Sequence, residues 1–346
     1  MSTRAYVLLT AMPPTRGHMA LIQFARGVAD TVEVHLQTQP GEPLVQARYD
    51  SLVAATRHMD NVNIHWMHKP LPQEASPEDE AKFWDMWAGF LADWGIQTSD
   101  FIVASEDYGI KLAEFTGATF IPYDIDREVV KTKATPVRKN TLSHFDKIIP
   151  EFQPYLRKRI TIFGAESTGK TTLARWLAEV VNGQFLPEWA RPYLEHVGPE
   201  ITWDKMRNIW YGQRALQDSA DVVAINKPFI IQDTDLYSTL GYWQYNSWQI
   251  DGEVPAGLHV DAVERKSDLY IITPSNIPFE ADQLRYGGDH REIETEEWTT
   301  FAKLHNLNYI VLESDELTKR TSESLRAIWK LFGTPLEYER EGNDHA

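Results

Sequence analysis

The sequence lacks cysteine altogether. This absence excludes disulfide bonds, thiolate metal sites and a cysteine nucleophile. Long apolar runs are also missing, because no stretch approaches the roughly 18 residues that span a bilayer. The first residues have neither the basic start nor the long apolar core of a signal peptide. We therefore expect a cytoplasmic protein with no membrane partner.

Net positive charge is lacking too. The chain has 34 basic and 50 acidic residues and a formal charge of −16, whereas a broad nucleic-acid-binding surface normally has the opposite sign. We therefore expect no nucleic-acid partner. The 346 residues, 42% hydrophobic and 24% charged, are typical of a globular protein and long enough for two domains.

Positive charge is nevertheless concentrated between residues 127 and 159, which hold nine Lys and Arg residues and three acidic ones. Such an excess suits a small polyanion such as a nucleoside triphosphate, although composition alone favours a basic linker with solvated charges. Within this segment we expect Arg157, Lys158 and Arg159 to be solvated or to line a contact between domains.

Two parts of the chain share one pattern: an apolar run, a turn of small residues and an amphipathic helix. The runs are Ala5–Thr10 and Arg159–Phe163. Each predicts the first strand–helix unit of a parallel sheet, where ligands bind beyond the carboxyl ends of the strands. We therefore predict an α/β fold with two tandem parallel-sheet domains, residues 1–152 and 153–346, divided near the prolines of Ile149–Leu156.

Other apolar runs predict the remaining strands. They lie at Thr31–Thr38, Asn61–Met67, Phe101–Ser105, Phe120–Asp124, Phe229–Gln232, Leu269–Thr273 and Tyr309–Leu312. The aromatic residues of segment 83–94 recur at helical spacing, so we expect them to face the core rather than a ligand.

A complete phosphate-binding motif opens the second half. Gly164–Thr171, GAESTGKT, matches G-x4-G-K-[ST] and lies between a predicted strand and a helix, where its backbone N–H groups can surround phosphate oxygens. Lys170 would bridge the β- and γ-phosphates of ATP, and the Thr171 hydroxyl would ligate Mg²⁺. The predicted nucleotide-binding residues are Gly164, Ser167, Thr168, Gly169, Lys170, Thr171 and Thr172.

Acidic residues follow a later strand of the same half. Phe229–Gln232 leads into Asp233 and Asp235. Asp233 can hold the magnesium, and Asp235 would point the same way and meet a substrate hydroxyl. The alternative is that both acids simply start a loop.

Two further elements carry charge in this half. In PEWARPY, Glu188 and Arg191 are placed to hold a ribose hydroxyl and a phosphate, or they form a plain capping pair. Arg285 and Arg291 flank a Gly-Gly pair. That composition suits a mobile lid that brings positive charge onto a transferred phosphoryl group, or an ordinary surface loop.

A second motif opens the first half. Thr15, Gly17 and His18 fit (H/T)-x-G-H, which opens a helix in nucleotidylyltransferases. Gly17 permits close backbone approach, and His18, beside the positive helix end, can donate to a phosphate. The alternative is a surface histidine that caps a helix. About 120 residues later, Thr132–Arg138 resembles the I-S-x-T-x-x-R motif of the same superfamily, so Thr135 and Arg138 would contact the β- and γ-phosphates of ATP.

Taken in this order, the motifs resemble the bifunctional NadR-type nicotinamide-nucleotide adenylyltransferase/ribosylnicotinamide kinase family over roughly residues 5–333. SEDYG at Ser105–Gly109 and YDIDRE at Tyr123–Glu128 resemble segments between its two adenylyltransferase signatures. GAESTGKTTLARWLAE, PEWARPYLE, the Gln213 helix, the DTD triplet and the lid arginine follow its kinase order. The resemblance implies a Rossmann-like nucleotidylyltransferase domain followed by a P-loop kinase domain.

The resemblance also implies two reactions. One phosphorylates the 5′-hydroxyl of ribosylnicotinamide with ATP, and the other joins the mononucleotide to the AMP part of a second ATP, giving NAD and pyrophosphate. The implied small-molecule partners are ATP, ribosylnicotinamide, nicotinamide mononucleotide and NAD, and the cofactor is Mg²⁺. Either Glu188 or Asp233 would be the kinase base. The implied catalytic residues are His18, Arg138, Lys170, Glu188, Asp233 and Arg285.

The chain departs from the family pattern in places. Leu9–Pro13 keeps only the proline of the usual G-x-F-x-P opening, and Lys133 replaces a serine. A kinase with a weak or inactive adenylyltransferase half is therefore one alternative, and a nucleotide-sensing regulator is another. Some members carry an N-terminal helix-turn-helix, but here the first predicted strand begins near residue 5, so we expect no DNA binding.

Other features are left open by the sequence, among them a homo-oligomer and the choice between nicotinamide and nicotinic acid forms. Several aromatic residues of the second half are candidates to stack on the flat, cationic nicotinamide ring of the riboside. These are Trp203, Trp210, Tyr211, Tyr242 and Trp243.

Overall fold

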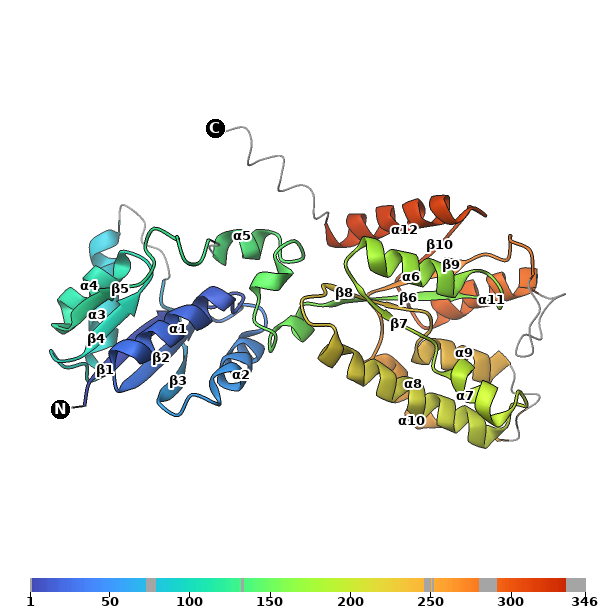
Figure 1. Cartoon of the computed structure of the whole chain (residues 1–346), viewed down its shortest axis with the longest axis horizontal. Coiled ribbons are helices and arrows are strands. Elements are labelled where there is room, and N and C mark those ends of the chain that lie inside the picture. The colour runs from blue at the N-terminus through green and yellow to red at the C-terminus, as the bar shows by residue number, and fades with distance from the viewer. Residues whose placement is uncertain are drawn as a thin grey trace. The chain divides into compact units, whose positions relative to one another are not determined.

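The chain divides into two compact units, Met1–Tyr155 and Leu156–Ala346 (Figure 1). The sequence placed a domain boundary slightly earlier, after residue 152. The computed structural model describes residues 2–72, 79–131, 134–245, 250, 252–279 and 291–333, with the side chains of 291–294 excepted.

The first unit contains a five-stranded parallel sheet in the order β3-β2-β1-β4-β5. This order matches the first five strands of the Rossmann-type order 3-2-1-4-5-6. Its strands, all within two residues of the predicted runs, are β1 (Arg4–Leu9), β2 (Thr31–Thr38), β3 (Val62–His68), β4 (Phe101–Ala104) and β5 (Thr119–Pro122).

Helices connect these parallel strands. They are α1 (Arg16–Val28), α2 (Val45–Thr56), α3 (Glu80–Ala92), α4 (Tyr108–Thr116) and the short α5 (Ala134–Lys139). Because such crossovers are right-handed, α1 and α2 cover one face of the sheet and α3 and α4 the other. As the helical spacing predicted, α3 buries Phe83, Trp87 and Leu91, whereas Trp84, Phe90 and Trp94 of the same segment are half-buried.

The second unit contains a parallel sheet in the order β10-β9-β6-β8-β7. Its strands are β6 (Lys158–Gly164), β7 (Gln184–Leu186), β8 (Phe229–Gln232), β9 (Leu269–Thr273) and β10 (Tyr309–Val311). Every residue of β8 and β9 is buried, as expected for central strands covered on both faces. The prediction of two tandem parallel-sheet α/β domains is therefore confirmed.

Seven helices of the described residues surround this second sheet. They are α6 (Lys170–Val180), α7 (Ala190–Val197), α8 (Trp203–Val223), α9 (Leu236–Tyr245), α10 (Ala256–Glu264), α11 (Arg291–Leu304) and α12 (Leu317–Phe332). Within the ranges that the structure describes, no helix of either unit has the length and apolar character needed to cross a membrane.

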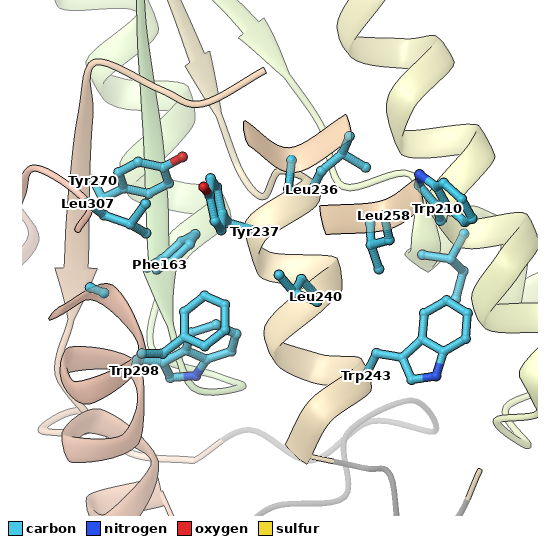
Figure 2. Packing of buried hydrophobic residues seen from close by; sticks show 14 of the residues in the cluster. Phe163, Trp210, Leu236, Tyr237, Leu240, Trp243, Leu258, Tyr270, Trp298 and Leu307 are labelled. Atoms are coloured by element: carbon cyan, nitrogen blue, oxygen red, sulfur yellow. The ribbon is translucent and has the colours of Figure 1, made fainter. Parts of the chain in front are cut away.

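Aromatic side chains form much of the core of the second unit. Helix α9 lies between Phe163 and Tyr270 of the sheet on one side and Trp210 of α8 on the other (Figure 2). Trp243 is fully buried there, and the indole of Trp210 donates to Asp261 at 2.7 Å. The prediction that these two tryptophans are available to stack on a ligand is therefore wrong, because apolar packing occupies their rings.

The basic residues at the start of β6 differ from expectation as well. Arg157 is buried, donates to the carbonyl oxygens of Ala224 and Lys227, and pairs with Asp221 at the end of α8. Arg159 pairs with the same carboxylate at 2.6 Å. The expectation that these arginines are solvated is wrong, because they bond to a helix end inside the second unit.

Candidate functional site

In both units the predicted motif follows the central strand of the sheet. The Thr15–His18 segment comes after β1, and the Gly164–Thr171 segment comes after β6. In each sheet this central strand lies where the strand order reverses, because strands that follow it in the chain lie on both of its sides. Ligands of open parallel sheets bind at that point, beyond the carboxyl ends of the strands.

Thr15 and His18 form a reciprocal cap at the start of α1. The Thr15 side chain accepts from the backbone N–H of His18, and the His18 ring accepts from the backbone N–H of Thr15 at 2.9 Å. Two free N–H groups at the helix start are satisfied in this way. The alternative interpretation, a histidine that caps a helix, therefore describes the geometry correctly. The cap, however, uses only Nδ1 of the ring.

The cap determines which nitrogen of His18 carries the proton. Because Nδ1 accepts from a backbone N–H, the neutral ring carries its hydrogen on Nε2, which can donate to a ligand. Burial, together with the positive charges of Arg127 and Arg138, lowers the pKa of His18 to about 4. His18 is thus a neutral hydrogen-bond donor at physiological pH.

Gly17 lies against a turn from later in the chain. A Cβ atom at Gly17 would lie 3.2 Å from the Val130 side chain, so a larger residue would push that turn away. The turn is closed by Asp124, whose carboxylate accepts from the backbone N–H groups of Val129 and Val130. The turn that begins in the YDIDRE segment and ends at Val130 therefore packs over the opening of α1.

Arg138 reaches the same place from α5. Its Nε donates to the carbonyl oxygen of Met12, between β1 and α1, at 3.1 Å, and its charge acts on His18. The structure thus brings together the two basic side chains that the two motifs predicted. Thr135 is exposed on α5. Thr132 and Lys133, from the same motif, lie outside the described residues.

A second arginine of this unit was not predicted. Arg48, in the first turn of α2, is 1% exposed and donates to Glu42 at 2.5 Å. Its Nε and Nη1 have no partner among the residues that the structure describes. A buried cation with free donors beyond the carboxyl end of β2 suits an anionic group. No motif marks it, because its importance depends on burial.

In the second unit, glycines and one strained residue shape the loop after β6. Gly164, Ser167 and Gly169 have φ angles of 140°, 57° and 81°, in the range that favours glycine. Lys170, the first residue of α6, donates back to the carbonyl oxygens of Gly164 and Ala165 at 3.0 and 2.7 Å. Its ammonium group therefore lies over the loop itself.

The remaining loop threonines have different surroundings. Thr168 is buried, where its hydroxyl bonds to the carbonyl oxygen of Ala165 and to the hydroxyl of Thr273 on β9. The predicted ligand role of its side chain is therefore not favoured, whereas its backbone remains part of the loop. Thr171 and Thr172 are exposed in the first turn of α6.

Thr171 and Asp233 lie together as the magnesium hypothesis requires. The Thr171 hydroxyl donates to Oδ2 of Asp233 at 2.6 Å. The other carboxylate oxygen is buried and has no partner in the described part of the chain. Mg²⁺ is commonly held by one or two protein oxygens with phosphate and water completing six ligands. This orphaned oxygen and the adjacent hydroxyl fit such an ion.

Glu188 lies in the same electrostatic environment. Burial raises the pKa of its carboxyl group, the nearby Lys170 opposes that shift, and Asp233 adds to it. A half-buried carboxyl group with a raised pKa, near both the phosphate-binding lysine and the candidate metal ligand, is typical of a proton acceptor in a reaction.

The predicted arginines of this unit are described only in part. Arg191, on α7, contributes positive charge to the Glu188 environment and lies 3.8 Å from Glu195. Arg285 and the side chain of Arg291 lie outside the described residues. Of the aromatic candidates, Tyr242 contacts the loop, since its hydroxyl lies 3.5 Å from the Gly164 carbonyl oxygen.

Asp235 does not occupy the predicted position. Its carboxylate is fully buried and accepts from the backbone N–H of Ser238 and from the Tyr270 hydroxyl, each at 2.9 Å. Burial raises its pKa to about 6. The prediction that it meets a substrate hydroxyl is wrong: α9 begins directly after it, and the carboxylate caps this helix from within the core.

Gln213, on α8, connects the two segments that carry Glu188 and Asp233. Its side chain is 1% exposed, accepts from the backbone N–H of Trp189 at 3.0 Å and donates to the carbonyl oxygen of Thr234 at 3.2 Å. No role for this residue was predicted from the sequence. The available signal was a glutamine on the buried face of a helix, which does not identify its partners.

Comparisons with known proteins agree with this architecture. A family model described as an AAA domain matches residues 159–320. Two curated relatives, each a "Trifunctional NAD biosynthesis/regulator protein NadR", from Escherichia coli strain K12 and Salmonella typhimurium, are 23% identical over 93% of this chain and 81% of their own length.

Two crystal structures resemble the whole chain. A NadR protein in complex with NR gives a TM-score of 0.70 at 20% identity, covering 96% of this chain and 97% of that one. A NadR protein in complex with NAD and AMP-PNP gives a TM-score of 0.68 at 21% identity, covering 97% and 98%. These likenesses show that the two-unit fold is shared.

Proposed function

Because the chain belongs to the NadR-type family, whose curated relatives act in NAD biosynthesis, we propose that it is a bifunctional NAD salvage enzyme. At the coarser level it is a nucleotide-binding transferase. In the proposal, the second unit phosphorylates ribosylnicotinamide with ATP. The first unit then joins the mononucleotide to the AMP part of another ATP, releasing pyrophosphate.

One observation carries this proposal: each sheet has its own phosphate-binding turn, and each turn has its own reactive side chains. In the second unit Lys170, Thr171, Asp233 and Glu188 lie together. In the first unit His18 and Arg138 do so. A protein that only sensed nucleotides would need neither the half-buried carboxyl group of Glu188 nor a second set of reactive side chains.

In the proposed kinase reaction, Glu188 accepts the proton of the riboside 5′-hydroxyl as that oxygen bonds to the γ-phosphorus of ATP. The bond from the γ-phosphorus to the β–γ bridging oxygen breaks, and ADP leaves. Asp233 is less suited to this step because it already accepts from Thr171. Lys170 would leave its loop carbonyls and stabilise charge on the β- and γ-phosphates. Asp233 and Thr171 would hold Mg²⁺, which when bound neutralises phosphate charge. Arg191 and Arg285 remain candidates for further phosphate contacts.

In the proposed adenylyl transfer, an oxygen of the mononucleotide phosphate attacks the α-phosphorus of ATP, and pyrophosphate leaves. His18 donates from Nε2 as charge develops on the reacting phosphates, and Arg138 neutralises the departing β- and γ-phosphates. The free donors of buried Arg48 suit the phosphate of the mononucleotide. Neither reaction requires a covalent enzyme intermediate.

Product analysis tests both halves. Purified protein is incubated with ATP, Mg²⁺ and either ribosylnicotinamide or nicotinamide mononucleotide, and the products are separated by chromatography. We expect mononucleotide and ADP in the first case, and NAD and pyrophosphate in the second. Mononucleotide without NAD would support the kinase alone, and no product in either incubation would contradict the proposal.

Gln213→Met is expected to lower kcat for riboside phosphorylation about tenfold. The substitution keeps most of the side-chain volume but removes both hydrogen bonds that tie Trp189 and Thr234 to α8. Small displacements of catalytic groups cost one to two orders of magnitude in rate. Steady-state kinetics with saturating ATP and riboside measure the effect.

Gln217 supplies a matched control one turn along the same helix. It is equally buried, but it donates to the side chain of Gln232 within the core. Gln217→Met should lower thermal stability to a comparable degree while leaving kcat within about twofold, because its partner carries no reactive group. Equal losses of kcat in both variants would contradict a positioning role for Gln213.

A further inference from the structure

A buried arginine lies beneath the phosphate-binding loop of the second unit. Arg320, on α12, is 3% exposed. None of the described residues forms an ion pair with it, and its donors go to backbone carbonyl oxygens and one side-chain amide instead. Burying a cation without an ion pair is costly, and the negative charges of Asp315 and Glu323 offset only part of that cost.

The first contact is with the loop. Nη1 of Arg320 donates to the carbonyl oxygen of Thr168 at 2.5 Å. In a trans peptide the carbonyl oxygen and the next N–H point in opposite directions. The N–H of Gly169 therefore points away from the guanidinium, to the side where phosphate oxygens bind. A Cβ atom at Gly169 would lie 3.4 Å from Nη1, so the guanidinium packs directly against the loop.

The other contacts anchor the guanidinium to neighbouring strand ends. Nε donates to the carbonyl oxygen of Ser314, which follows β10, at 2.7 Å. Nη2 donates to the carbonyl oxygen of Pro274, which follows β9, at 3.2 Å, and to the side chain of Asn276. One planar group thus connects the loop to the segments that follow β9 and β10.

We propose that Arg320 is a positioning residue of the nucleotide site, which orients the Thr168–Gly169 peptide toward phosphate and places a fixed positive charge beneath it. The guanidinium stays protonated at all physiological pH values, and it contacts the loop directly. Its charge therefore favours a polyphosphate on the other side of the loop. This inference rests on the nucleotide-binding part of the proposed function.

Titration calorimetry with ADP and Mg²⁺ tests the proposal. Arg320→Lys keeps the charge but loses the planar fork that reaches three segments at once. We expect it to weaken ADP binding about tenfold. The heat of ADP binding that remains in the Lys170→Ala variant is assigned to binding outside the loop, and it is subtracted from the heat measured for the other proteins. In the kinase assay, KM for ATP should rise while KM for the riboside stays the same, a selectivity that a general loss of stability would not produce.

Arg157 provides the matched control. It is also buried and also donates to two backbone carbonyl oxygens, but it lies at the opposite end of β6. Arg157→Lys should lower thermal stability comparably and leave ADP affinity within about twofold. Wild-type ADP affinity in Arg320→Lys, or an equal loss of affinity in Arg157→Lys, would overturn the proposal.

Asn276→Ala keeps the proposal testable if Arg320→Lys does not fold. Asn276 is exposed, so its truncation leaves the core intact, yet it frees one guanidinium donor. We expect two- to threefold weaker ADP binding, and unchanged affinity would count against the proposal. Wild-type protein that binds ADP but phosphorylates no riboside would refute the proposed kinase while leaving the Arg320 comparison valid.

Discussion

Lys170→Ala is expected to abolish phosphorylation of ribosylnicotinamide while NAD synthesis from the mononucleotide continues nearly unchanged. Lys170 is the cation of a loop that otherwise offers backbone N–H groups, and its ammonium group already lies over that loop. Without it, charge that develops on the transferred phosphoryl group has no stabilising side chain at this position. The two rates are measured separately, each with its own substrate and saturating ATP.

Lys158→Ala is the control for this experiment. Lys158 is in the same unit, its side chain is about one-third exposed, and it lies 3.6 Å from Asp268. Exposed pairs of this kind contribute under about 1 kcal/mol, so either rate should change less than about threefold. If Lys170→Ala stopped both reactions in a folded protein, the assignment of two separate nucleotide sites would be wrong.

His18→Ala should have the converse effect, with adenylyl transfer falling about 10²- to 10³-fold and kinase activity unchanged. That is the usual cost of removing one hydrogen-bond donor aimed at charge that develops in a transition state. The donor is Nε2, because Nδ1 is occupied by the backbone N–H of Thr15. NAD formation is followed at saturating ATP and mononucleotide.

Two further measurements bear on the same residue. Since the pKa of His18 is about 4, kcat/KM for the mononucleotide should show no inflection from His18 near pH 6.5. His58, an exposed histidine of the same unit, provides the control, and His58→Ala should leave both rates within about twofold. Unaltered adenylyl transfer in His18→Ala would remove this histidine from the site.

The sequence predicted the architecture well because its signals are local. Apolar runs predicted every strand of the two sheets except the short edge strand β7, because a central parallel strand is buried on both faces and has few polar residues, whereas β7 has only one buried residue. The two turns were recognisable because close contact between backbone and phosphate restricts which residues fit. The lysine, threonine and histidine of these turns then follow from their place in the motif.

The sequence could not determine which polar residues are buried, or against what. Asp233 and Asp235 are equivalent in the sequence, yet one bonds to Thr171 and the other caps α9 inside the core. Trp243 has the aromatic ring that stacking requires, but packing around α9 buries its side chain completely. In each case the outcome depends on which distant segment covers the side chain, and local spacing contains no such information.

The same reason explains the residues that were missed. Arg48 and Arg320 belong to no motif, and Gln213 was predicted only as part of its helix. The contacts of all three depend on burial or on backbone groups distant in the sequence. Every residue has a backbone carbonyl oxygen, so a hydrogen bond to such an oxygen cannot be recognised from residue types in the sequence. Motifs and periodicity were therefore enough to predict the two phosphate-binding turns and all strands of the two sheets but β7, whereas only the packed tertiary structure decided which side chains support them.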